Sequence, residues 1–185
     1  KLKKRLEEES VKDSNMSKYL IGEAFHELAE IKIKCKTFKE TLTRLIQKNE
    51  KPIVLFCVHL SILEMLMQLC QDLNCKHAEI SGAVSMKKRD AIVTQFQSNE
   101  IDVLCCTIAA AGVGLTLTKS HHVIIAESDW VPGNLSQAID RVHRIGQEKE
   151  VHIDRIVFSD SLDEWILKVE NGKKKMHKLL LAKKK

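Results

Sequence analysis

The 185-residue sequence has few aromatic residues (4%), two prolines and no long apolar run. With so few aromatic rings, the core must be built mainly from aliphatic side chains. A membrane-spanning helix needs about 18 or more consecutive apolar residues, and a signal peptide needs an apolar stretch after a basic start, so we expect neither. Apolar residues make up 44% of the chain and charged residues 30%, which favours one soluble, intracellular globular domain of ordinary size.

The six cysteines form no CxxC pair and show no Cys/His spacing of the zinc type, so we expect neither disulfides nor a structural metal. Cys57, Cys105 and Cys106 lie in apolar runs, which predicts buried thiols in a reducing compartment. His121 and His122 are adjacent at the start of a predicted strand, where successive side chains point to opposite faces. We therefore expect that they are not a metal-binding pair, and we predict no metal ligands.

The basic charge is concentrated at one end of the chain. The net charge is +5, and residues 168–185 contain eight lysines with Glu170 as the only acidic residue. A like-charged terminal block is typical of a solvated end, and also of a nucleic-acid contact or a nuclear address. The charge pattern alone leaves these alternatives open.

From about residue 37, short apolar runs alternate with amphipathic stretches. The pattern predicts strands at 53–58, 77–81, 101–106, 122–126 and 151–158, and helices at 37–48, 61–73, 85–97 and 134–145. Apolar strands joined by helices require a parallel sheet that is covered on both faces. We predict an α/β fold with a doubly wound, mostly parallel sheet over 37–160. Residues 1–36 are expected to form a helical lead-in or linker, and 161–185 a C-terminal basic helix or tail.

Ligands of open parallel sheets bind at the carboxyl ends of the strands, and a cationic segment lies there. The segment QAIDRVHRIGQ (137–147), read as a helix, places Gln137, Arg141 and Arg144 within roughly 60° of one another. Guanidinium forks suit phosphate oxygens. The alternative is a solvated face with an Asp140–Arg144 pair.

A second segment, TIAAAGVGLTLT (107–118), follows a predicted buried strand and is rich in small residues. Small side chains let the backbone approach a phosphate closely, and its free N–H groups can donate to the phosphate. Tight packing of a helix on the sheet is the alternative.

In this order, these segments resemble the C-terminal RecA-like lobe of superfamily 2 helicases, and specifically the Swi/Snf-type DNA translocases, over about 37–161. FCVHLSILEML is similar to motif IV, TIAAAGVGLTLT to motif V and QAIDRVHRIGQ to motif VI, where HRIGQ is the Swi/Snf-type form. The AAG and GLT steps and Ala126-Glu127 are similar to the annealing-helicase branch. Ser128-Asp129-Trp130 and Ile139-Asp140 are more similar to nucleosome remodellers, so both branches stay open.

The resemblance implies roles for single residues. Arg141 and Arg144 match the arginines that reach the γ-phosphate of ATP bound to the other lobe, and would act as arginine fingers. Gln137, Gly114 and Asp140 match positions on the nucleotide side. Other residues match positions that contact the DNA backbone: His59, Ser61, Ser81, Gly82, Thr107 and Gly112. Such contacts do not distinguish bases, so DNA binding would be independent of base sequence and sensitive to salt.

The sequence contains no GxxxxGKT or GxxxxGKS loop and no DExH-type box. We therefore expect the ligands of magnesium to lie on an N-terminal RecA-like lobe of the same protein, and this chain alone to be inactive. The resemblance implies an ATP-dependent translocase that acts on double-stranded or branched DNA in the nucleus, with no membrane partner. A non-enzymatic nucleic-acid or partner-binding module and an RNA helicase lobe are the alternatives, and Gln147 argues against the second.

Overall fold

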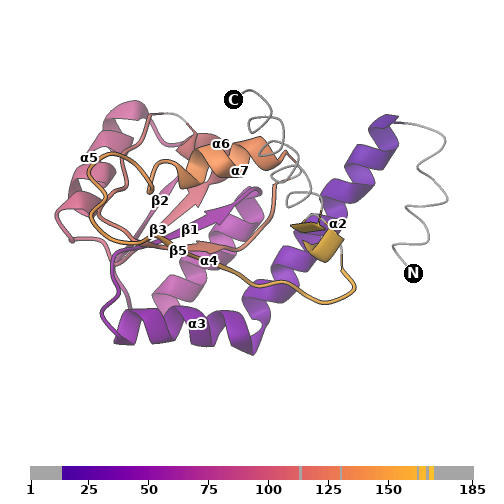
Figure 1. The fold of residues 1–185 in the computed structure, drawn as a ribbon, viewed down its shortest axis with the longest axis horizontal. Coiled ribbons are helices and arrows are strands. Elements are labelled where there is room, and N and C mark those ends of the chain that lie inside the picture. Colours follow the sequence, from indigo (N-terminus) through magenta and orange to yellow (C-terminus); the bar gives the residue numbers. More distant parts are fainter. Residues whose placement is uncertain (1–13, 113, 130, 162, 166, 169–185) are drawn as a thin grey trace, which may run out of the picture. The chain divides into compact units, whose positions relative to one another are not determined.

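The computed structural model describes residues 14–112, 114–129, 131–161, 163–165 and 167–168. The chain divides into two compact units, His26–Ile156 and a second unit composed of Lys1–Phe25 and Val157–Lys185. The elements, labelled in Figure 1, are α2 (Ser14–Lys34), α3 (Lys36–Gln47), β1 (Ile53–Cys57), α4 (Leu60–Asp72), β2 (His77–Ile80), α5 (Met86–Gln97), β3 (Val103–Thr107), α6 (Ile108–Ala111), β4 (His122–Ile125), α7 (Pro132–Ile139) and β5 (His152–Arg155).

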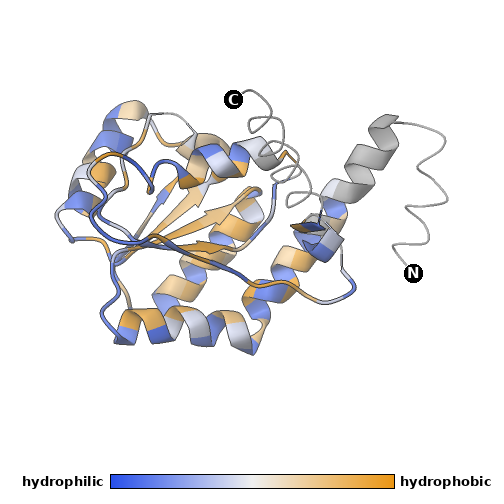
Figure 2. Ribbon diagram, in the orientation of Figure 1, coloured by the Kyte–Doolittle hydropathy of each residue, from blue (hydrophilic) through white to orange (hydrophobic). Residues whose placement is uncertain are grey.

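The strands form one sheet in the order β2-β3-β1-β4-β5, and every neighbouring pair is parallel. The central strand β1 has Ile53 opposite both Val103 of β3 and His122 of β4. All five residues of β1 are buried, as a strand covered on both faces requires, and Figure 2 shows the strands as mainly apolar. The predicted α/β fold with a doubly wound parallel sheet is confirmed.

Side chains that alternate along each central strand divide the core into two layers. Val54 and Phe56 of β1 pack on one face, while Ile53, Leu55 and Cys57 pack on the other. The first layer also contains buried residues of α5, α6 and α7, and the second contains buried residues of α3 and α4. Figure 1 shows these two groups of helices on opposite sides of the sheet. Because both faces of the sheet are covered, loops with polar side chains can lie only where the strands begin and where they end.

Three helices end in the same way. Asn49, Asn74 and Asn99 follow α3, α4 and α5 with φ angles of 58°, 51° and 62°. Asparagine is the residue other than glycine that best tolerates this left-handed conformation, which turns the chain out of the helix. Each asparagine thereby reverses the chain toward the start of the next strand, as the doubly wound connection requires.

The core of the His26–Ile156 unit begins before residue 37. Ala29 and Ile33, near the end of α2, are buried in the same layer as α3 and α4. At the other end, residues 163–165 and 167–168 of the expected C-terminal helix are helical, while the lysine-rich segment 169–185 lies outside the described residues. Among the described helices, none has the length and apolar character that crossing a bilayer demands.

Candidate functional site

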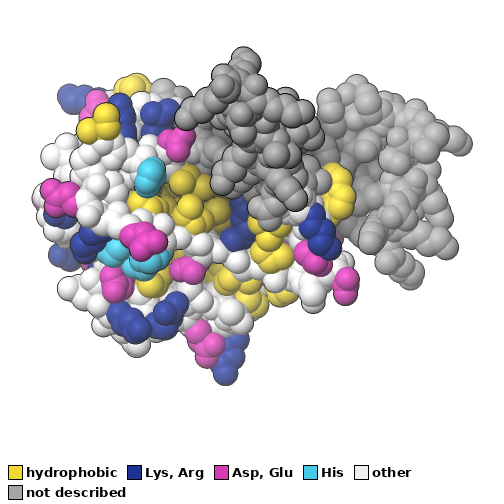
Figure 3. Space-filling model, viewed as in Figure 1, with side chains coloured by type: hydrophobic (Ala, Val, Ile, Leu, Met, Phe, Trp, Pro, Cys, Tyr) yellow, Lys and Arg dark blue, Asp and Glu magenta, His cyan; other side chains and the backbone are white. Residues whose placement is uncertain are grey.

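The carboxyl ends of the strands carry most of the residues predicted to be functional. His59 follows β1, Ser81 follows β2, Thr107 ends β3 and Glu127 follows β4. Because β2, β3, β1 and β4 are neighbours and parallel, the loops after them lie side by side along one edge of the sheet. This edge is called the carboxyl edge below, and the opposite one the amino edge. Figure 3 shows basic and acidic side chains interspersed over the described part of the viewed face.

Glu127 holds the loop between β1 and α4. Its carboxylate, with no exposed surface, accepts hydrogen bonds from the backbone N–H groups of Val58 and His59 at 2.8 and 2.9 Å. The other oxygen, Oε1, contacts Nδ1 of His59. A single buried carboxylate therefore satisfies two backbone donors that precede a helix and orients the imidazole of His59, which remains 43% exposed.

Ser61 and His59 are also connected to the middle of α2. Nε2 of His26 lies 2.6 Å from Oγ of Ser61, and the rings of His26 and His59 meet edge to face at 5.1 Å. Ser61 itself is exposed. Two of the predicted contacts with the DNA backbone therefore form one polar cluster at the start of α4.

Ser81 and Gly82, after β2, differ in their access to solvent. Ser81 is only 1% exposed, and its carbonyl accepts a hydrogen bond of 2.8 Å from Nη2 of the buried Arg89. Nε of Arg89 donates to the carbonyl of Val84 at 2.8 Å, which closes the turn. Gly82 is exposed and has open space where a Cβ would be. Of the two predicted residues, Gly82 is the one placed to meet a partner.

Thr107 and Gly112 bound the short helix α6. Thr107 is 5% exposed and occupies the N-cap position without a side-chain capping bond, and the N–H of Gly112 donates to the carbonyl of Ile108 at 3.1 Å. Beyond it, Gly114 has a φ of +65°, which glycine adopts without strain. The small residues therefore serve close packing of α6 as well as the bend that follows it.

The helix predicted over 134–145 is wrong in its second half. α7 ends at Ile139, and Arg141 and Arg144 lie on turns, so they do not share a helical face with Gln137. The cause is a long-range hydrogen bond, because the carbonyl of Arg141 accepts from the N–H of Leu117 at 2.9 Å rather than continuing the helix. Ile145, which the helical pattern placed on the buried stripe, is fully exposed.

Arg141 nevertheless joins the two segments that the sequence singled out. Its Nη2 donates to the carbonyl of Gly112 at 2.7 Å, while its buried Nε has no hydrogen-bond partner among the described residues. Gln137 belongs to the same junction, since its Oε1 lies 4.0 Å from the place where a Cβ of Gly112 would be. Asp140 is exposed at the end of α7. The junction thus brings a guanidinium, an amide and a backbone turn together.

Arg144 lies beside this junction and is exposed. Its Nη1 is 3.2 Å from Oγ1 of Thr116 and 3.4 Å from the carbonyl of Leu115, both in the loop that follows α6. These are long contacts that an incoming anion could replace at little cost. The arrangement presents one anchored arginine and one accessible arginine at the carboxyl edge, which suits a bound phosphate group.

Comparison with known proteins agrees with this arrangement. Residues 34–146 match the model of the helicase conserved C-terminal domain. The chain belongs to the helicase conserved C-terminal domain family. Human DNA annealing helicase and endonuclease ZRANB3 is 35% identical over 131 residues, which cover 70% of this chain and 12% of that protein. Chromatin-remodeling ATPase INO80 of Cryptococcus neoformans var. neoformans serotype D is 36% identical over 110 residues, or 59% of this chain and 6% of that protein.

A solved structure agrees in fold. The C-terminal part of the Fun30 ATPase domain superposes with a TM-score of 0.67 at 26% identity, covering 71% of this chain and 43% of that chain. This helicase C-terminal domain is therefore a RecA-like lobe of the Swi/Snf type within superfamily 2. It spans only a small part of the length of its curated relatives.

Sequence reasoning missed two residues that hold loops of this helicase C-terminal domain, Glu127 at the carboxyl edge and Gln147 against the loop before β4. Glu127 was noted only as a branch marker, although an acid directly after a buried strand signals a role at the edge. Gln147 was noted only as part of a motif. Its Nε2 lies within 2.6, 3.0 and 3.3 Å of the carbonyls of Ser120, Thr118 and Val142. It therefore holds the end of the motif VI turn against the loop before β4.

The cysteines of this helicase domain take no part in the edge. Cys57 and Cys106 are fully buried. Burial raises the pKa of the Cys106 thiol to about 12 and also raises the pKa of Cys57. A buried thiol with a raised pKa is a poor nucleophile, so these two residues serve as core side chains.

Proposed function

We propose that this chain is the C-terminal lobe of an ATP-dependent translocase that moves on double-stranded DNA. The observation that carries the proposal is the junction in which Arg141 donates to the carbonyl of Gly112, with Arg144 exposed beside it. A phosphate-facing arginine must be held in position before it can stabilise transition-state charge, and Gly112 supplies that hold. The same hydrogen bond couples motif V, on the DNA side, to motif VI, so a shift of Gly112 would move Arg141.

The residues at the junction fit a nucleotide phosphate. Arg144 has a free approach, and the unpaired Nε of Arg141 is a buried donor that an acceptor would satisfy. ATP with Mg²⁺ would supply the phosphoryl group, with the metal ligands on an N-terminal RecA-like lobe of the same protein. On this side, Arg144 and Arg141 would neutralise phosphate charge, while Gln137, Gly114 and Asp140 shape the turn that presents them.

DNA contacts are assigned to the loops on the β1, β2 and β3 side of the same edge. Ser61 and Gly82 are exposed there, the side chain of His59 is 43% exposed, and Thr107 and Gly112 follow β3, which lies between β2 and β1. Such groups can contact phosphates but carry no base code, so binding should be independent of sequence and should weaken as salt rises. The names of the relatives support work in DNA repair or chromatin remodelling, and hence in the nucleus.

The test is ATP hydrolysis by the full parent protein without nucleic acid, with duplex DNA, with forked DNA, with nucleosomes and with RNA. We expect stimulation by DNA that is lost in Arg141→Ala and Arg144→Ala and kept in Lys39→Ala, a control at an exposed lysine on α3. A preference for forks would favour the annealing branch, and one for nucleosomes the remodellers. Stimulation by RNA alone would contradict the proposal and favour an RNA helicase lobe.

A second function is favoured by one observation. Both arginines donate to groups of this chain, which is what a non-enzymatic binding module with packing arginines would also need. That alternative predicts that Arg141→Ala lowers the melting temperature but leaves binding of the nucleic acid or partner intact. Measuring both quantities on the same variants separates the two functions.

A further inference from the structure

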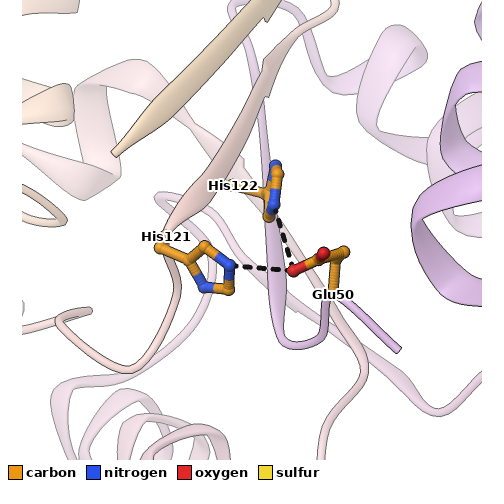
Figure 4. A group of neighbouring side chains, drawn as sticks. All are labelled: Glu50, His121 and His122. Atoms are coloured by element: carbon orange, nitrogen blue, oxygen red, sulfur yellow. Dashed lines mark hydrogen bonds and ion pairs between the residues drawn. The ribbon is translucent and has the colours of Figure 1, made fainter. Parts of the chain in front are cut away.

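Three side chains converge at the amino edge, away from the proposed function. Glu50 lies between α3 and β1, and His121 and His122 lie at the start of β4. Oε2 of Glu50 is 3.0 Å from Nε2 of His121 and 3.4 Å from Nε2 of His122 (Figure 4). Each residue offers a ligand atom, and the three atoms lie within 4.8 Å of one another. Among the described residues this is the one such group found.

The expectation that His121 and His122 point to opposite faces is wrong. Their ring centroids are 4.4 Å apart, and both rings face Glu50. The reason is that β4 begins at His122, so His121 precedes the strand and is free of its alternation. The carbonyl of His121 accepts from the N–H of His152 at 2.8 Å, which fixes the backbone at this turn.

The donor set is that of a transition-metal site. Two imidazoles and one carboxylate bind zinc at about 2.0–2.2 Å each, which places tetrahedral ligand atoms about 3.3 Å apart. The separations of 3.0 and 3.4 Å from Oε2 of Glu50 are close to this value, and all three ligand atoms lie within 4.8 Å of one another. Each imidazole can offer a ring-nitrogen lone pair to a metal ion.

Hydrogen bonding among the described residues leaves one ring nitrogen of the cluster unpaired. Nδ1 of His122 is buried and has no hydrogen-bond partner among the described residues. His121 and His122 are only 8% and 11% exposed at their side chains, whereas Glu50 is 39% exposed and leaves an approach for an ion. A mostly buried pair of imidazole rings beside an accessible carboxylate is a preformed ligand set.

We propose that Glu50, His121 and His122 bind one divalent ion of the zinc class, with water in the fourth position. The site joins the α3–β1 connection to the start of β4, so the ion stabilises the sheet at its amino edge. The residues that the proposed function uses follow the opposite ends of the strands. The metal-site proposal can therefore be tested independently of the proposal on ATP hydrolysis.

The test uses the 185-residue chain without a histidine tag, with zinc chloride as the probe. Calorimetry should give one ion per chain. Zinc at 100 times its Kd should raise the melting temperature by about 5–10 °C relative to the same chain in EDTA. Glu50→Gln keeps the size of the side chain and removes its charge, and should weaken binding about 10–100-fold. His152→Gln is the matched control, because this ring stacks on His122 at 5.1 Å but is no ligand.

A measurement on the wild-type chain keeps the proposal testable even if a variant fails to fold. Co²⁺ bound at this site should give the visible absorption of a tetrahedral ion, abolished by EDTA and by excess zinc. Absence of both this absorption and a zinc-dependent shift in melting temperature would overturn the proposal. Zinc binding equal in the wild type and Glu50→Gln, or lost only in His152→Gln, would also overturn it by assigning the ion to other residues.

Discussion

The carboxyl and amino edges of the sheet are built by different kinds of contact. At the carboxyl edge, Glu127 and Arg141 each bond to the backbone of a distant loop. At the amino edge, Glu50, His121 and His122 bond to one another through their side chains. Bonds to backbone fix where loops lie, whereas a cluster of side chains adds local stability. Substitutions at the two edges should therefore change different measurements.

The largest expected effect is the loss of ATP hydrolysis when the accessible Arg144 is replaced. In the full parent protein, Arg144→Ala should lower DNA-stimulated ATP hydrolysis by about 10³-fold or more, the size found for arginine fingers. Because Arg144 is exposed and its two contacts are long, the free energy of unfolding should change by less than about 0.5 kcal/mol. Steady-state hydrolysis and urea unfolding measure the two effects, with Lys39→Ala as the control. Equal losses in both variants would contradict the finger role.

The next largest effect is expected for Glu127→Gln, which tests whether Glu127 holds the loop between β1 and α4. Glu127→Gln removes the charge that accepts two backbone N–H groups and turns an NH₂ group toward one of its former donors. We expect a loss of about 2–3 kcal/mol in the free energy of unfolding, together with weaker binding of duplex DNA. Glu79→Gln, on the edge strand β2, is the control. If Glu127→Gln has no larger effect than the control, the buried carboxylate does not hold the loop.

Gln147 should have a smaller effect of the same kind. Gln147→Ala leaves the carbonyls of Thr118, Ser120 and Val142 without this donor, which should cost about 1–2 kcal/mol in unfolding free energy. Gln68→Ala, at an exposed side chain on α4 that bonds only to Asp72, should cost much less. Urea unfolding of both variants is the measurement. Equal costs would mean that the turn after Arg144 is held by other contacts.

The same difference between the edges separates what the sequence predicted from what it did not. Local patterns located the strands, the helices and the carboxyl edge, because apolar runs and helical spacing are set by neighbours in the chain. The end of α7 depends on the N–H of Leu117, which lies far from Arg141 in sequence. The convergence of His121 and His122 depends on where pairing of β4 begins. Long-range contacts of this kind leave no periodic signal.

The smallest expected effect compares two glycines of the carboxyl edge. Gly114 has a φ of +65°, whereas Gly82 has no positive φ, and neither has an atom within 4 Å of the position of a Cβ. Gly114→Ala should therefore cost about 1 kcal/mol of stability through backbone strain alone, and Gly82→Ala should cost almost nothing. Thermal unfolding of the two variants measures the difference. If Gly114→Ala were as stable as Gly82→Ala but slowed DNA-stimulated hydrolysis, the bend after α6 would serve the function of motif V rather than the stability of the fold.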